Sequence, residues 1–249
     1  MPNFVRQKTE YMRKYWWKII CMVLLIYTVI SGFLIPIPDL ANNSVLEQTI
    51  RNLFFHVPMW FAMIIVLFIS LVYSIKYTSK QRIEDDMMAA ECANVGILLG
   101  ILGASTGAVW AKFTWGQFWP NDPKLNGAAI AVMMYFAYGI LRNGIEDPQK
   151  KAKVSAIYNI FSFPIFIVLI LILPKINDSL HPGNGGNPGF NKYDLDSNMR
   201  MVFYPAVIGW SLLAWWIVTL NYRIKLISHK KHNNYEQIKT ATISTIDSI

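Results

Sequence analysis

The sequence predicts an all-α integral membrane protein, a bundle of about six transmembrane helices. Of its 249 residues, 54% are hydrophobic and 15% are charged, whereas soluble domains carry roughly 25% charged residues. Several uninterrupted apolar runs approach the ~20 residues that a helix needs to cross ~30 Å of hydrocarbon. The net charge of +8 comes from Lys and Arg in the short segments between these runs. That pattern indicates membrane topology rather than nucleic-acid binding.

Six apolar segments are the expected spans, and they cover residues 16–35, 57–75, 89–111, 127–141, 154–173 and 201–220. The first exceeds the roughly 7 to 15 apolar residues of a secretory signal, so we expect it to remain as a helix. Pro58 marks the expected start of the second, because a missing N–H is tolerated in the first turn. The third carries Gly96, Gly100, Gly103 and Gly107, which predict a central helix that another helix approaches closely.

The last three segments have less regular ends. The fourth is short, so we expect it to extend into Asn126 and Arg142. Pro164 should kink the fifth, and Pro174 should stop it. The sixth precedes a polar, basic stretch. We therefore divide the chain into a membrane domain, residues 1–222, and a basic cytoplasmic tail, residues 223–249.

The positions of the basic residues predict the orientation. The N-terminus, the second and fourth connections and the tail together hold 17 Lys and Arg, and the other three connections hold 6. By the positive-inside rule, both termini face the cytoplasm. Cys21 and Cys92 then lie near the cytoplasmic ends of spans, where thiols stay reduced, and we expect no disulfide. Glu91 lies at the same end, where we expect its carboxylate to reach water by snorkelling.

Two of the four histidines fall on the predicted external side. His56 precedes the second span and His181 lies in the fifth connection, whereas His229 and His232 belong to the basic tail. Imidazoles from two loops can ligate opposite faces of one haem. Zinc normally takes four protein ligands, or three with an open position, so two histidines without a Cys or carboxylate cluster favour haem. The alternative is that each histidine bonds to loop backbone. There is no Cys-x-x-Cys-His, so covalent haem attachment is not expected.

The third connection, residues 110–126, is rich in tryptophan. Five of its first sixteen residues are aromatic, namely Trp110, Phe113, Trp115, Phe118 and Trp119. An aromatic belt at the headgroups accounts for one or two of them. A platform for a flat porphyrin, with Lys124 or Arg51 pairing its propionates, accounts for them equally well. A second loop motif, the glycine-rich residues 183–189, lacks a following Gly-Lys-Ser/Thr, so we interpret it as a flexible turn.

These residues together resemble the tryptophan-rich haem-handling family of cytochrome c biogenesis, and within it the haem exporter protein C (CcmC) type. The family core is Trp-Gly-x-x-Trp-x-Trp-Asp-x-Arg/Lys-Leu in an external loop. Here it runs from Trp115 to Leu125, and Asn121 replaces its third tryptophan. Residues 51–58 and 179–181 resemble the two histidine sites that flank this core.

The resemblance implies a role in haem delivery rather than catalysis. It implies haem b, bound non-covalently at the outer face of a bacterial cytoplasmic membrane with His56 and His181 as axial ligands. The implied neighbours of the haem are Trp110, Trp115, Trp119 and Asp122 in the platform, with Arg51 and Lys124 near the propionates. The implied partners are a periplasmic haem chaperone, the subunits of an ATP-binding-cassette (ABC) transporter and a small membrane subunit.

Two other functions remain open. A cytochrome c haem lyase of the same family would normally have more spans and additional histidines inside the membrane, and the six segments contain no histidine. A small-solute transporter tends to have broken helices in paired halves and ionisable groups at the midplane, and neither is evident in this sequence.

Overall fold

The computed structural model describes residues 2–37, 48–181 and 195–246, and the surroundings of side chains in 15–37, 48–181 and 195–235. The glycine-rich residues 183–189 lie outside the described residues. Within these ranges the elements are α1 (Pro2–Leu34), η1 (Ile50–Asn52), α3 (Leu53–Lys80), α4 (Ile83–Trp115), α5 (Pro123–Asn143), α6 (Pro148–Ile167), η2 (Val168–Ile172), α7 (Leu173–Ile176) and α8 (Ser197–Ile246). Six helical segments are long and apolar enough to cross a membrane. This confirms the predicted all-helical class.

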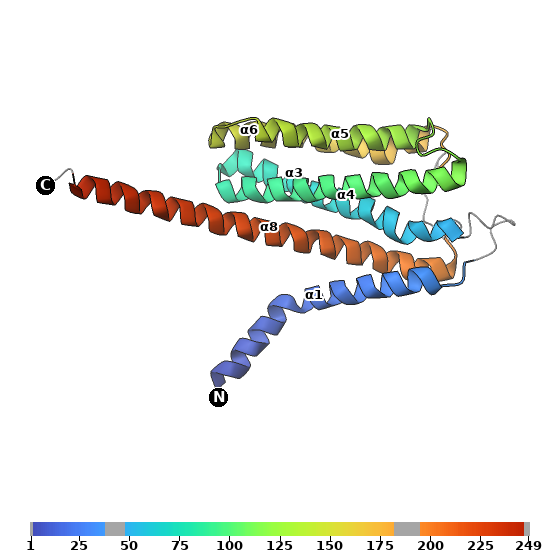
Figure 1. The fold of residues 1–249 in the computed structure, drawn as a ribbon, viewed down its shortest axis with the longest axis horizontal. Helices are drawn as coiled ribbons and strands as arrows, with labels where there is room; N and C mark the ends of the chain where they lie inside the picture. The colour runs from blue at the N-terminus through green and yellow to red at the C-terminus, as the bar shows by residue number, and fades with distance from the viewer. Residues whose placement is uncertain (1, 38–47, 182–194, 247–249) are drawn as a thin grey trace.

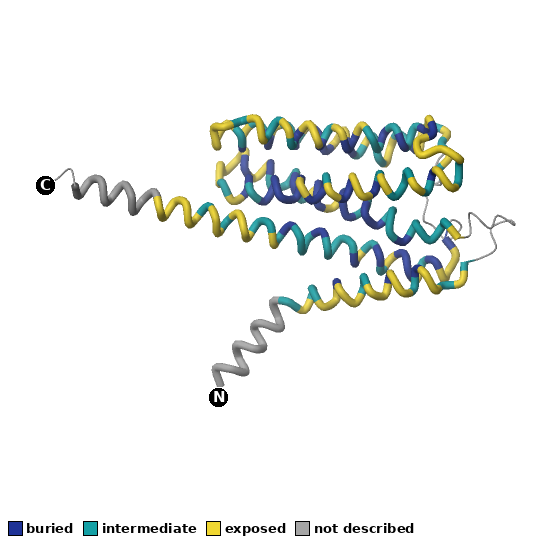
Figure 2. The backbone as a smooth tube through the Cα atoms, viewed as in Figure 1, coloured by how far each residue is buried: buried dark blue, intermediate teal, exposed yellow. Residues whose placement is uncertain are grey.

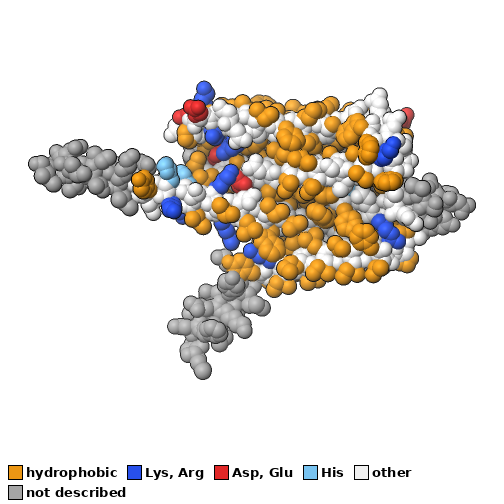
Figure 3. Space-filling view, viewed as in Figure 1, with side chains coloured by type: hydrophobic (Ala, Val, Ile, Leu, Met, Phe, Trp, Pro, Cys, Tyr) orange, Lys and Arg blue, Asp and Glu red, His pale blue; other side chains and the backbone are white. Residues whose placement is uncertain are grey.

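The helices form a layered bundle (Figure 1). α3 and α4 pack along each other at its centre, α5 and α6 cover them on one side, and α8 packs on the other. α1 lies against α8, and its residues 15–34 are mostly exposed or half-buried, whereas the buried residues gather on α3 and α4 (Figure 2). Apolar side chains cover the middle of the molecule between its more polar ends (Figure 3), as lipid contact requires.

The glycines of α4 allow side chains of α3 to pack against its backbone. The four contacts, in order along the helix pair, are Leu67 on Gly96, Met63 on Gly100, Trp60 on Gly103 and His56 on Gly107. A Cβ at Gly96 would lie 2.5 Å from Leu67, well inside van der Waals contact. The predicted close approach of another helix to these four glycines, which we call the glycine stripe, is therefore confirmed. The four contacts fix the register of α3 against α4.

The tryptophan-rich segment is shorter as a loop than the sequence predicted. α4 continues to Trp115 and ends at Gly116, which adopts a left-handed conformation with φ of 79°. α5 begins at Pro123 rather than at Asn126, with Asp122 as its N-cap. Both features are standard helix ends, a glycine after the C-terminus and a proline in the first turn. Only residues 116–122 therefore lie outside the helices.

Three other helix boundaries differ from the prediction. α3 already begins at Leu53, so Pro58 lies inside it rather than at its start. Pro164 lies inside α6, and the π-helical η2 follows it, in keeping with local rearrangement near a proline. Pro174 opens α7 instead of ending the segment. α8 continues through the basic residues to Ile246, since no glycine or proline interrupts residues 221–246.

The other end of the bundle, where α3 joins α4, is closed by ion pairs. Asp86 of α4 accepts two hydrogen bonds from Arg142 of α5, at 2.7 and 2.6 Å. Glu91 is only 3% exposed and pairs with Lys225 of α8. The expectation that Glu91 reaches water was therefore wrong, because the polar stretch of α8 brings a cation to it.

Candidate functional site

A cavity of about 210 Å³ lies at the end of the bundle where α4 joins α5. It lies between α3, α4, α5 and η2, and along α3 it extends from His56 to Ile64, which is about 12 Å of helix. Most of its lining is apolar, and its few polar side chains include both histidines predicted as ligands, together with Lys124 and Asn52. An apolar pocket with a few converging polar groups is the usual form of a cofactor or ligand site.

His56 reaches the cavity from the first turn of α3. Its Nδ1 lies 3.1 Å from the hydroxyl of Thr106 on α4. Its ring packs on Gly107, where a Cβ would come within 2.6 Å of Cε1, and meets Trp60 edge-on at 6.3 Å between centroids. The ring is therefore fixed between two helices, and it is part of the cavity wall.

His181 reaches the same cavity from the loop after α7, and two tryptophans of α4 hold it. Its ring lies 4.7 Å from Trp115 and 6.1 Å from Trp110, measured between centroids. Its Nδ1 is buried and makes no hydrogen bond to any described residue, with Asp122 Oδ1 at 3.6 Å. Burial, together with the charge of Lys124, lowers the pKa of His181 to about 3, because Asp122 opposes them only in part. The imidazole is therefore neutral, which is the form that binds a metal.

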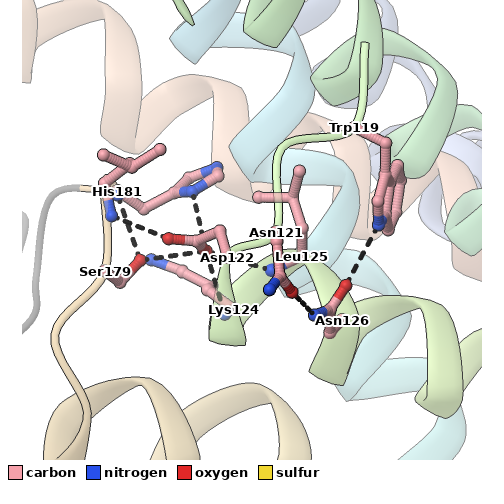
Figure 4. A network of polar contacts seen from close by, with 9 residues as sticks. Trp119, Asn121, Asp122, Lys124, Leu125, Asn126, Ser179 and His181 are labelled. Carbon is pink, nitrogen blue, oxygen red and sulfur yellow. Dashed lines mark hydrogen bonds and ion pairs between the residues drawn. The ribbon is translucent and has the colours of Figure 1, made fainter. Parts of the chain in front are cut away.

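Asp122 connects the two loops at this end (Figure 4). Its Oδ1 accepts hydrogen bonds from the backbone N–H groups of Lys124 and Leu125, at 2.9 and 3.2 Å, and from the Ser179 hydroxyl, at 3.1 Å. Its Oδ2 accepts from the Leu180 N–H at 2.7 Å. Burial favours its neutral form, but these hydrogen bonds outweigh burial and lower its pKa. Asp122 is 1% exposed and does not line the cavity. Because its hydrogen bonds go to both segments, it holds the loop after α7 against the start of α5.

Trp119 and Lys124 also line the cavity. Trp119 is 40% exposed, and its Nε1 donates to Asn126 Oδ1 at 3.2 Å. Asn126 in turn donates to Asn121, the residue that replaces a tryptophan of the family core, at 2.9 Å. Asn121 therefore helps to hold the loop (Figure 4).

Like Asp122, two further predicted site residues lie outside the cavity lining. The guanidinium of Arg51 donates to the backbone oxygens of Gly32 and Ile35, at 3.0 and 2.9 Å, and so binds the end of α1 to the start of α3. Trp115 packs edge-on against Trp110, at 5.0 Å, and against His181. Trp110 does line the cavity. The structure thus brings together five of the eight predicted residues, His56, Trp110, Trp119, Lys124 and His181.

Sequence reasoning missed two polar contacts behind His56. Thr106 supplies the hydroxyl beside the ring, and Asn52 donates from its Nδ2 to the Thr106 carbonyl at 3.2 Å. Both contacts depend on the register between α3 and α4. The sequence signal that could have found them is the glycine stripe, since Gly107 is where the His56 ring fits.

The chemistry of the site suits a flat, largely apolar metal complex. Two imidazoles at one apolar cavity can ligate a metal, indole rings can contact a macrocycle, and Lys124 can pair with a carboxylate. The buried, unpaired Nδ1 of His181 is a polar group that a ligand could satisfy. Within the described residues, no three His, Cys, Asp or Glu side chains are grouped to hold a bare metal ion.

Comparison with known proteins agrees with this chemistry. Residues 2–237 match the family described as Heme exporter protein C. Among individual relatives, Heme exporter protein C of Paracoccus denitrificans is 25% identical over 155 residues, 62% of each chain. That of Escherichia coli K12 is 22% identical over 208 residues, 80% of this chain and 78% of the relative. The cytochrome c biogenesis protein CcsA of Synechococcus is 38% identical over 65 residues, 26% of this chain and 21% of the relative. Several of these alignments, including that with the Paracoccus protein, span less than two thirds of the relative.

Proposed function

Since this chain belongs to the heme exporter protein C family, we propose that it binds haem b non-covalently in the cavity and passes it to a periplasmic haem chaperone. The chain has a role in cytochrome c haem handling and is a multi-pass membrane protein. In the proposal, the cavity faces the outside of the cytoplasmic membrane. The excess of Lys and Arg at the opposite side of the predicted topology supports this orientation.

The observation that carries the proposal is that His56 and His181, 125 positions apart in sequence, line one apolar cavity. We assign them as the two axial ligands of the haem iron. Trp110 and Trp119 would contact the macrocycle, and Lys124 would pair with a propionate. This set supplies ligands, apolar surface and a cation within one pocket, as non-covalent haem binding requires.

The other predicted residues act on this set from outside the cavity. Trp115 packs on His181, and Asp122 bonds to the two residues before His181, so both hold this ligand in place. Arg51 fixes the end of α1 instead of facing a propionate. Binding and release of haem need only ligation of the iron and contact with the macrocycle. In the proposal, no residue of the site therefore forms or breaks a covalent bond of a substrate.

Haem binding is tested with purified protein in mild detergent. Wild-type protein should show a Soret band after haem is added, and the double variant His56→Ala, His181→Ala should lose most of it. His229→Ala with His232→Ala is the matched control, because it removes two imidazoles from α8, away from the cavity. A Soret band that the first double variant leaves unchanged would refute the proposed ligands.

Delivery is tested in a second system. Haem-loaded protein in proteoliposomes should transfer haem to a purified periplasmic haem chaperone when the subunits of the ABC transporter and the small membrane subunit of the export system are present. Transfer is measured as appearance of haem on the separated chaperone. If a loaded protein gives no transfer with the full set of partners, the delivery role is wrong even though haem binding stands.

A haem lyase of the same tryptophan-rich family is the second candidate, because the chain also has a 65-residue similarity to a cytochrome c biogenesis protein that is not named as a heme exporter. A lyase would attach haem to an apocytochrome without the chaperone. The deciding experiment expresses a reporter cytochrome c with this chain in cells that lack the chaperone. Maturation there would support the lyase, and its absence would support delivery.

A further inference from the structure

We propose that Thr106 is a positioning residue that holds His56 in the tautomer with Nδ1 protonated and Nε2 free to ligate iron. This inference rests on the proposed haem site. The structure places the Thr106 hydroxyl 3.1 Å from His56 Nδ1, on the helix that faces the ring. Neither residue type nor spacing marks Thr106 in the sequence.

The direction of this hydrogen bond follows from the other partners of the hydroxyl. Thr106 Oγ1 lies 2.8 Å from the backbone oxygen of Leu102 and 3.1 Å from that of Gly103. Carbonyl oxygens only accept, and we assign the single hydroxyl proton to the nearer of them, that of Leu102. The oxygen lone pair that remains then accepts from His56, so Nδ1 carries the ring proton. Nε2 keeps its lone pair, which is the form of a metal-binding imidazole.

Three further contacts keep this arrangement in place. Asn52 donates to the Thr106 backbone oxygen at 3.2 Å and so ties this turn of α4 to the start of α3. Gly107 leaves room for the ring, and Trp60 meets it edge-on. With one nitrogen bonded and its ring packed on both sides, His56 presents Nε2 in one orientation before haem arrives. Partners of this kind typically change metal affinity 10- to 100-fold when removed.

The first test measures the tautomer itself in haem-free protein. Nitrogen NMR of ¹⁵N-histidine-labelled protein, with His56 assigned by comparison with His56→Ala, should show a protonated Nδ1 and an unprotonated Nε2. Thr106→Val should convert His56 to a tautomer mixture. A wild-type signal from the opposite tautomer would overturn the inference, whatever the variants do.

The second test measures haem. Thr106→Val should weaken ferric haem binding 10- to 100-fold and reduce the low-spin fraction in the visible spectrum, whereas Thr106→Ser, which keeps the hydroxyl, should restore both. Ser105→Ala is the matched control, because its hydroxyl makes the same back-bond, to Ile101 O at 2.8 Å, without touching His56. Unchanged affinity and spectrum in Thr106→Val would overturn the inference. If the wild-type protein itself did not bind haem, the proposed function would be refuted, and the NMR result on the His56 tautomer would still stand.

Discussion

The side chain of His181 lies with its Nδ1 3.6 Å from Oδ1 of Asp122, the residue that caps α5. One carboxylate therefore starts a membrane helix and holds the loop that carries a proposed haem ligand. The two loops of the site are coupled through it, because each would lose hydrogen bonds if the carboxylate were removed. His56 has no such link to a loop, since it is part of α3.

Replacing Asp122 should therefore affect both stability and haem binding. Asp122→Ala removes the helix cap, which costs about 0.5 to 2 kcal/mol, and it also leaves the Leu180 N–H and Ser179 hydroxyl without their acceptor. We expect a lower Tm and weaker haem affinity, measured by thermal unfolding and haem titration in detergent.

Asp147→Ala is the control for this variant. Asp147 caps α6 and accepts from the Lys150 N–H at 2.6 Å, but it lies away from the cavity. Its loss should lower Tm by less than Asp122→Ala does, because only a cap is removed, and should leave haem affinity unchanged. If both variants weakened haem binding equally, the coupling through Asp122 would be disproved.

The buried His181 should make the protein less stable at acidic pH. Its folded pKa of about 3 lies below the ordinary value of 6.5, so between these values the unfolded chain binds a proton that the folded chain does not. The free energy of unfolding should consequently fall as pH drops from about 6.5 towards 3. Thermal unfolding from pH 7 to pH 4 should show a shallower decline for His181→Gln than for wild type. His232→Gln, exposed on α8, should keep the wild-type slope. If Tm declined with falling pH equally in all three proteins, His181 would not be the group whose low folded pKa destabilises the protein in acid.

The sequence predicted the parts of the fold that depend on hydrophobicity and on small residues in the helices. Apolar runs gave the six spans, and the glycines of α4 predicted its close contact with α3. The Asp122-Pro123 pair is also a helix-start signal, but it falls in a run interpreted as an external loop. The predicted start of α5, at Asn126, was therefore three residues late, because the apolar run begins only at residue 127 and the helix-start signal precedes it.

The details of the site could not be predicted, because they depend on contacts between distant segments. Arg51 was expected near haem, yet packing of α1 brings two backbone oxygens to its guanidinium. Thr106 carries no local signal, and only the α3–α4 register places it beside His56. Residue types and topology thus predicted which two histidines would lie at the same end of the bundle, and tertiary packing determined which side chains surround them.

Adding one methyl group at Gly107 should disturb the haem site. A Cβ there would lie 2.6 Å from Cε1 of His56, so the ring must move. Gly107→Ala should weaken haem binding about tenfold or more, the range seen when support for a metal-binding histidine is lost. Gly139→Ala makes the same change where the nearest atom, on Ile97, is 3.9 Å away, and should bind haem normally. Wild-type affinity in Gly107→Ala would show that the ring tolerates displacement.

The ion pair between Asp86 and Arg142 should stabilise the opposite end of the bundle without affecting haem. Both side chains are largely buried and joined by two hydrogen bonds, so Asp86→Ala leaves an unpaired cation and should cost about 3 to 5 kcal/mol. Removing both groups, in Asp86→Ala with Arg142→Met, should destabilise less than the sum of the single variants, because neither charge is then left alone. Unfolding in detergent measures these differences, and each variant that folds should give the wild-type Soret band, since neither residue reaches the cavity. Additive losses would show that the two charges do not stabilise each other, and an altered haem spectrum would show that the two ends of the bundle are coupled.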